Sequence, residues 1–209
     1  MRLFLYVVAR DYGFAPNPFG GVCTLATCKP EVRKRASVGD WVVGLASKLD
    51  RATPGIVYAM RVDEVTTYDA YWKDARFQTK KPTRTGSVKQ LFGDNIYHRD
   101  ELGKWQQADS HHSLEGGLPN QRNIDNDTKS DGVLVGRRFA YWGSSAREVP
   151  QQFLDFEGQS ILVNRGYKTH LPPALAAAFV SWFESLGVQG YQAPPYMWQR
   201  AGSRWAHPA

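Results

Sequence analysis

Residues 41–62 read WVVGLASKLDRATPGIVYAMRV, and two apolar runs dominate this stretch. The first run (residues 41–46) and the second (residues 56–65) are rich in β-branched and aromatic side chains, which favour strands. A polar segment and a Pro-Gly turn separate the two runs. Gly44 interrupts the first run, and a glycine inside a strand is typical of a bulge or of a close approach by another part of the backbone.

Strand-like patterns recur on either side of this stretch. Residues 1–10 form a continuous apolar run, and residues 132–142 return to a strand-like pattern. A helix is predicted at residues 171–186, because two prolines fit its first turn and Gly187 is a good C-terminal stop. Many strands and few helices predict an α+β fold, with a curled sheet or small barrel and helices packed on it.

The region at residues 80–132 has weak hydrophobic periodicity and is rich in Gly, Asn, Asp, Ser and Gln. So long a segment is typical of a functional loop or of disorder, but its embedded aromatic residues argue against plain disorder. We therefore expect a single domain over residues 1–209 with a loop-rich insertion at about 80–132. The predicted helix and a tail rich in proline and aromatic residues follow at about 171–209.

The composition is that of a globular protein. Of the 209 residues, 42% are hydrophobic, which is enough for a sizeable core. No apolar run reaches the roughly 18 residues that a membrane span needs. The N-terminal run is too short for a secretory signal and lacks a cleavage site after it. We therefore expect a cytoplasmic protein without membrane contact.

The net charge of +6 is confined to the first half of the chain. Residues 1–105 contain 17 basic and 11 acidic side chains, whereas the remaining residues contain 9 of each. A basic bias favours a polyanionic partner, because contacts to phosphates release counterions. The presence of only two cysteines, Cys23 and Cys28, excludes a disulfide-rich scaffold.

The sequence contains no glycine-rich phosphate loop, no GxSxG, no HExxH and no paired CxxC motif. The two cysteines and the histidines His98, His111 and His112 lack the regular spacing of zinc ligands. We therefore expect no metal site and no cofactor. The two thiols are more typical of small buried hydrophobic residues.

A different grouping of residues is compatible with catalysis. Cys23 would act as a nucleophile if His111 or His112 lay beside it, and Asp109 would supply an acid–base partner. The polar segment 109–113 is also typical of a hydrogen-bonded loop. Cys23, Asp109 and His111 are therefore the candidate catalytic residues, and the sequence leaves open whether the protein is an enzyme.

A basic stretch with interleaved aromatic residues lies at residues 71–89. Its rings are suited to stack on bases and its cations to contact phosphates, although charge runs are often simply solvated surface. The residues expected to contact a nucleic-acid backbone are Lys73, Arg76, Lys80, Lys81, Arg84 and Lys89.

The front part of the chain resembles EVE domains of the PUA-like superfamily. The similarity rests on an initial aromatic strand, a Gly-Asp-hydrophobic strand that ends near a serine, and a Pro-Gly-Ile-hydrophobic-Val strand followed by a Tyr/Asp segment. These features correspond to Gly39, Asp40, Ser47, Pro54, Gly55, Ile56, Val62 and Tyr68 or Asp69. The match covers about the first third to two fifths of the chain.

The whole chain is more closely similar to the second of the nucleotide-modification-associated domain families. The stretches that carry this similarity are YVVARDYGFAPNPFGGVCTLATCKP, VGDWVVGLASK, DNIYHRD, the cluster at 109–113, VLVGRRFAYWG and RGYK. That family occurs in bacteria and phages and is associated with DNA base modification systems.

The two resemblances imply a PUA-like, EVE-type β-barrel with a pocket that accepts a nucleobase. By position, the implied ligand-binding residues are Asn17, Phe19, Cys23, Trp41, Ser47, Lys48 and Trp72. The implied function is a module that recognises a modified base, in nucleic acid or as a free nucleotide, alongside partner proteins of a DNA modification system. The alternatives are an enzyme that processes a modified nucleotide with Asp, His and Cys groups, and an interaction subunit that docks through its aromatic tail.

Overall fold

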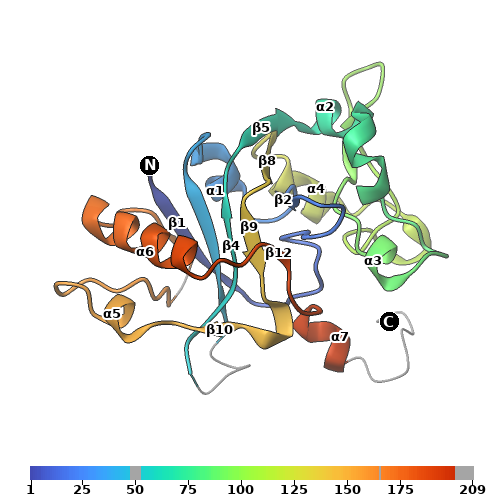
Figure 1. Cartoon of the computed structure of the whole chain (residues 1–209). Helices are drawn as coiled ribbons and strands as arrows, with labels where there is room; N and C mark the ends of the chain where they lie inside the picture. The colour runs from blue at the N-terminus through green and yellow to red at the C-terminus, as the bar shows by residue number, and fades with distance from the viewer. Residues whose placement is uncertain (48–52, 165, 201–209) are drawn as a thin grey trace.

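The computed structural model describes residues 1–47, 53–164 and 166–200, and its central feature is a mixed sheet (Figure 1). From one edge to the other, the strands are β11 (Tyr167–Lys168), β1 (Leu3–Val8), β3 (Trp41–Ala46), β4 (Gly55–Arg61), β9 (Phe139–Tyr141) and β12 (Gly190–Tyr191), and β10 (Arg147–Glu148) pairs with β4. β1 and β3 are parallel, whereas β4 is antiparallel to both β3 and β9. The run at residues 41–46 is therefore a central strand, as predicted. The run predicted as one strand at residues 56–65 is also central, but its strand ends at Arg61, and residues 64–65 belong to a strand of another sheet.

The main sheet is open, which corrects the expectation of a curled, EVE-type β-barrel. Its edge strands β11 and β12 are not hydrogen-bonded to each other in the described part of the chain. Each of these strands is only two residues long, and closure of a barrel requires a continuous ladder between the first and last strands. The predicted α+β class is confirmed, but the predicted barrel is wrong.

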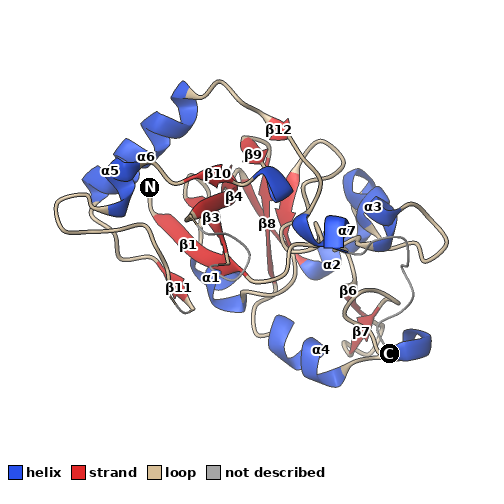
Figure 2. Ribbon diagram, turned by 90° about the horizontal axis from the view of Figure 1, so that it is seen from below, coloured by secondary structure: helices blue, strands red, loops and turns tan. Residues whose placement is uncertain are grey.

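One face of the main sheet is covered by α6 (Pro173–Ser185) and α5 (Gln151–Leu154), as Figure 2 shows. Trp41 contacts Phe183 of α6, with the two ring centroids 4.8 Å apart. Trp41 is 2% exposed, so it belongs to this core and not to the wall of a pocket. The helix predicted at residues 171–186 is confirmed.

A second, smaller sheet packs on the other face. Its strands are β2 (Cys23–Leu25), β8 (Gly132–Gly136) and β5 (Glu64–Thr67), and α1 (Pro30–Arg35) follows β2. Tyr6 and Tyr58 of the main sheet share one apolar cluster with Cys23 and Leu25. This shared core makes the small sheet a second layer over the main sheet.

A third layer is built from residues 68–127, which include most of the region at 80–132 with weak periodicity. Its elements are α2 (Tyr68–Lys73), the 3-10 helix η1 (Ala75–Lys80), α3 (Val88–Leu91), β6 (Tyr97–Arg99), β7 (Trp105–Gln107), the 3-10 helix η2 (Glu115–Gly117) and α4 (Gln121–Asp127). Buried aromatic rings dominate its core, which includes Tyr68, Tyr71, Phe77, Phe92 and Tyr97. Large apolar rings explain how a segment with so few aliphatic residues is folded.

Two short elements remain, the 3-10 helix η3 (Gly143–Ser145) and α7 (Tyr196–Arg200). Helix α7 lies against the N-terminal loop, where Nε1 of Trp198 donates a hydrogen bond to the Tyr12 carbonyl at 3.0 Å. The Trp198 ring also stacks on Phe19, with the centroids 5.7 Å apart. None of the described helices is both long and apolar enough to cross a membrane.

Gly44 lies where β3 and β4 change register. The pairing shifts between Gly44 and Leu45, which confirms the predicted bulge. A Cβ atom on Gly44 would lie 2.4 Å from Cε1 of Tyr58 and 2.6 Å from Cγ2 of Val8. The glycine therefore leaves room for Tyr58, whose hydroxyl shares a buried hydrogen bond of 2.8 Å with that of Tyr6.

We expect Gly44→Ala to destabilise the protein by about 1–3 kcal/mol, because the added methyl group overpacks this part of the core. Urea unfolding followed by tryptophan fluorescence measures the change. Gly86→Ala is the matched control, since its nearest neighbour is the flexible Gln90 side chain, and it should change stability by less than about 0.5 kcal/mol. If Gly44→Ala were as stable as the wild type, the added methyl group would not overpack the space beside Tyr58.

Candidate active site

Cys28 lies at a sharp turn between β2 and α1. Its φ of 56° and the φ of 41° at Lys29 place two consecutive non-glycine residues in the left-handed region, which is unfavourable for side chains with a Cβ atom. Two hydrogen bonds hold this turn. The Cys28 amide donates to Oδ1 of Asp127 at 2.9 Å, and Nε of Arg33 donates to the Cys28 carbonyl at 2.8 Å. The position of the cysteine is therefore fixed by contacts outside its own loop.

The ring of His112 lies between the Cys28 sulfur and a buried carboxylate. Its Nε2 is 3.7 Å from Sγ of Cys28, and its Nδ1 is 3.0 Å from Oδ2 of Asp127. The side-chain amide of Asn123 donates to the His112 carbonyl at 2.8 Å, which holds the backbone in place. Cys28 and Asp127 are 99 residues apart in the chain, so only folding brings these groups together.

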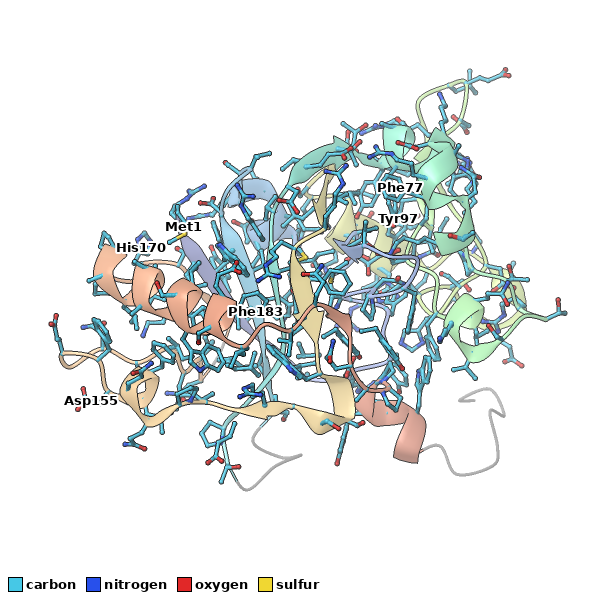
Figure 3. The ribbon with its side chains drawn as sticks, viewed as in Figure 1. Met1, Phe77, Tyr97, Asp155, His170 and Phe183 are labelled. Atoms are coloured by element: carbon cyan, nitrogen blue, oxygen red, sulfur yellow. The ribbon has the colours of Figure 1, made fainter. Side chains whose placement is uncertain are left out.

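Asp127 orients the histidine ring. It is the last residue of α4 and is 1% exposed. Its Oδ2 also accepts a hydrogen bond from the Tyr97 hydroxyl at 3.0 Å. Figure 3 shows Tyr97 on the side of the molecule that carries the third layer, away from Phe183 of α6. Because both of its oxygens accept hydrogen bonds, the carboxylate is held in one orientation.

Arg33 connects the cysteine turn to the end of α4. Its guanidinium donates to the carbonyl oxygens of Cys28, Asp127, Ser130 and Gly132. The residue is 1% exposed, and these bonds replace the water that the charge loses on burial. Arg33 thus fixes the distance between the segment that carries Cys28 and the segment that carries Asp127.

The two adjacent histidines favour opposite protonation states. Burial alone would lower the pKa of His112, but hydrogen bonds to Asp127 and Cys28 outweigh burial and raise it to about 9. Burial lowers the pKa of His111 to about 4, and the charge of His112 adds to this effect. At neutral pH His112 is therefore an imidazolium that donates to both of its neighbours, whereas His111 is neutral.

This arrangement fits a nucleophile, a base and an orienting carboxylate better than it fits a metal site. The three side chains offer ligand atoms within 4.8 Å of one another. However, both Asp127 oxygens already accept hydrogen bonds from N–H and O–H donors. The imidazole presents one nitrogen to the sulfur and the other to the carboxylate, which is the order of a catalytic triad.

Comparisons with known proteins place the chain in a family. A family model described as nucleotide modification associated domain 2 matches residues 1–202. The chain belongs to this family. This membership confirms the resemblance to the second of the nucleotide-modification-associated families and associates the chain with nucleotide-modification systems. Neither a curated protein nor a solved structure matched the chain.

None of the catalytic candidates taken from the sequence is a member of this triad, although the His111 ring lies next to that of His112, with the centroids 5.9 Å apart. Cys23 is fully buried in the apolar cluster between the two sheets, and burial raises the pKa of its thiol. His111 packs on the ring of Tyr12, and Asp109 accepts a hydrogen bond from the Ser113 hydroxyl. Among the described residues, no hydrogen bond or ion pair joins Cys23, Asp109 and His111.

Sequence reasoning misses Cys28 and Asp127 as site residues. A signal for Cys28 was available, because it follows the apolar strand β2 and precedes a Lys-Pro pair that begins a helix. A cysteine at such a junction is more accessible than one inside the strand. For Asp127 the sequence holds no comparable signal, since it is one of several acidic and amide residues in a short helix.

The ligand-binding residues expected from the resemblance are dispersed over the described part of the chain. Three of them are buried: Asn17, Cys23 and Trp41. Lys48 lies outside the described residues. Trp72 is half-buried, with the His98 ring stacked 4.1 Å away and Nζ of Lys81 3.7 Å from its ring centroid. The indole therefore already has a ring and a cation packed against it.

A small cavity lies where β1 and β3 end. Asp11 and Ser47 line it together with valine and alanine side chains, and its volume is about 190 Å³. Asp11 is 5% exposed and accepts a hydrogen bond of 2.6 Å from the Tyr141 hydroxyl. Burial raises the pKa of Asp11, and this hydrogen bond opposes the rise. Phe19 lines a separate, more open hollow of about 290 Å³.

The basic stretch is only partly exposed. Lys80 is 3% exposed, and its Nζ donates to four oxygens of the N-terminal loop and β2, so its expected contact with a nucleic-acid backbone is not available in this fold. Arg76 is exposed and pairs with Asp74 and Glu64. The other exposed members are Lys73, Arg84 and Lys89.

We expect His112 to contribute stability that depends on pH. Its pKa in the folded protein, about 9, exceeds the unfolded value of about 6.5. The contribution is therefore fully present below pH 6.5 and is lost as the pH rises through 9. In urea unfolding, the stability of the wild type relative to His112→Gln should fall by about 3 kcal/mol between about pH 6 and about pH 9.5.

The matched control is His111→Gln, because the pKa of His111 is lowered to about 4. Relative to this variant, the wild type should lose stability as the pH falls from about 6.5 toward 4, the opposite side of neutrality. A difference between the wild type and His112→Gln that does not change with pH would contradict the imidazolium at this position.

Proposed function

We propose that the protein is a thiol-dependent enzyme of a nucleotide-modification system, with Cys28 as its nucleophile. The observation that carries the proposal is the line of contacts from the Cys28 sulfur through His112 to Asp127. Cysteine enzymes use this order of groups, because the histidine exchanges protons with the reacting atoms while the carboxylate holds the ring. Membership in the family supports a nucleotide as one of the substrates.

The reaction class that fits these groups is acyl transfer. The Cys28 sulfur attacks a carbonyl carbon, an S–C bond forms, and the proton of the thiol resides on His112. His112 gives this proton to the leaving group as the bond between the carbon and the leaving group breaks, which leaves a thioester on Cys28. Water, or a hydroxyl or amino group of the nucleotide, then attacks the thioester and returns a proton through His112 to the sulfur.

A second candidate function is recognition of a base in the cavity beside Asp11. β1 and β3 are parallel, so their carboxyl ends meet at one edge of the sheet, a common place for ligands. The cavity volume of about 190 Å³ equals that of roughly six water molecules in the liquid, which leaves room for one heterocycle. The Asp11 carboxylate would accept hydrogen bonds from the amino groups of adenine, cytosine or guanine.

We expect p-nitrophenyl acetate to acetylate Cys28, because a cysteine positioned beside a histidine attacks an activated ester. Mass spectrometry of the intact protein and of its peptides should find one acetyl group on Cys28 of the wild type and none on Cys28→Ala. His112→Ala should slow the acetylation roughly 100-fold or more, since general acid–base catalysis typically contributes that much.

Cys23→Ala is the matched control for acetylation. The Cys23 side chain is fully buried, so its removal should leave the rate of acetylation unchanged. Circular dichroism establishes that each variant in the comparison is folded. Equal rates of Cys28 acetylation in the wild type and in His112→Ala would contradict the proposed enzyme.

For base recognition, we expect Ser144→Leu to abolish nucleoside binding, because the larger side chain would occupy the cavity that Ser144 lines. Isothermal titration with adenosine, cytidine, guanosine and uridine measures the affinities. Ser145→Leu is the control, since Ser145 is exposed and is not among the residues that line the cavity. Unchanged affinity of Ser144→Leu for every nucleoside that binds the wild type would exclude this cavity as the base site.

A further inference from the structure

We infer that Lys29 binds an anionic group of the substrate, a phosphate or a carboxylate, beside the Cys28 sulfur. The inference rests on the proposed role of Cys28 as the nucleophile and names the class of substrate that the site selects. Cys28, His112 and Asp127 alone would act on neutral and on charged compounds. A preference for anionic substrates therefore requires a separate group. The role of Lys29 and the role of Cys28 as nucleophile are tested separately.

The same turn that fixes Cys28 holds Lys29 next to it. The φ of 41° at Lys29 directly follows the φ of 56° at Cys28, and Pro30, which begins α1, restricts the backbone on the other side. The Lys29 side chain is half-buried, with Nζ 4.8 Å from the centroid of the Tyr6 ring. Tyr6 is fully buried, so the ring is a fixed surface below the ammonium group.

Within the described part of the chain, no carboxylate forms an ion pair with Lys29. Glu31, the nearest acidic residue along the chain, pairs with Arg35 instead. Burial lowers the pKa of Lys29, and the charge of Cys28 opposes this shift. The anion that the site itself supplies to Lys29 is therefore the sulfur of the nucleophile. A partly buried cation without a carboxylate partner is suited to bind an anion from outside.

The other cations close to Cys28 already have their partners. Arg33 donates to four backbone carbonyl oxygens, and His112 contacts Asp127 and the sulfur. Lys29 differs from both, because no carboxylate within the described residues forms an ion pair with it. Its partly buried position strengthens its attraction for an incoming oxyanion.

The competing interpretation is a purely structural cation–π contact between Lys29 and Tyr6. Such a contact requires only a positive charge over the ring and makes no use of the neighbouring sulfur. It predicts that a neutral residue at this position changes stability. It does not predict a change in the preference of Cys28 for charged over neutral reagents, and this difference defines the test.

Alkylation of Cys28 by iodoacetate, an anion, and by iodoacetamide, its neutral counterpart, tests the inference. Both reagents form an S–C bond and release iodide, so the ratio of their rates reports charge recognition and cancels the reactivity of the sulfur. We expect Lys29→Met to lower the ratio of the iodoacetate rate to the iodoacetamide rate about tenfold, as for the loss of one ion pair. Lys29→Arg should keep the ratio, and Lys104→Met, at an exposed position in the third layer, should leave it unchanged.

An unchanged ratio in Lys29→Met would overturn the inference, whether both rates stay the same or fall by the same factor. Added anions that protect Cys28 from labelling show whether the site binds a phosphate or a carboxylate. Inorganic phosphate and acetate are added in turn, and the anion that slows iodoacetamide labelling of the wild type, but not of Lys29→Met, is the one the site takes. If neither anion protects the wild type, the inference fails.

The failure of the proposed function has a different signature. Equal iodoacetamide rates in the wild type and in His112→Ala would show that the triad does not activate Cys28. The ratio of the two reagents in Lys29→Met would still decide whether Lys29 attracts anions to this thiol.

Discussion

The buried carboxylate of Asp127 is the constraint on which the candidate site depends. It is 1% exposed, and donors from Cys28, His112 and Tyr97 replace the water that it loses. These donors lie in the turn after β2, in the loop after β7 and in β6, so one carboxylate joins the second sheet to the third layer. Without these donors the charge would be buried and unpaired, which costs more free energy than the same bonds contribute when they are made.

A second buried network fixes the third layer to the N-terminal loop, and it follows the same principle. Asp94 accepts hydrogen bonds from the hydroxyls of Thr24 and Tyr71 at 2.6 and 2.8 Å, and Nζ of Lys80 donates to the Thr24 hydroxyl at 3.0 Å. Burial lowers the pKa of Lys80 and raises that of Asp94, while the attraction between the two charges opposes both shifts. Buried polar groups thus position the layers, while apolar clusters supply the stability.

The sequence predicts the central strands and the bulge at Gly44 because both are local signals: an apolar run, and a glycine inside it. Whether the sheet stays open or closes into a barrel is not predictable in this way, since closure depends on edge strands that are two residues long and carry no pattern. The site is harder still, because its parts are 99 residues apart and the sequence shows residue types without showing which side chains meet. Lys80 illustrates the same limit: a run of charges is normally exposed, and its burial follows from partners such as Asn17 in a distant loop.

The burial of Cys23 also determines how the protein responds to oxidants. The 209 residues contain two cysteines, both of them free, and Cys23 is enclosed in the core. A sulfenic acid formed on Cys28 would thus find no resolving thiol among these residues, and its recovery would require an external thiol such as glutathione. In the absence of such a thiol, further oxidation to the sulfinic and sulfonic acids would block the proposed nucleophile irreversibly. The proposed reaction would thus last only in a reducing environment.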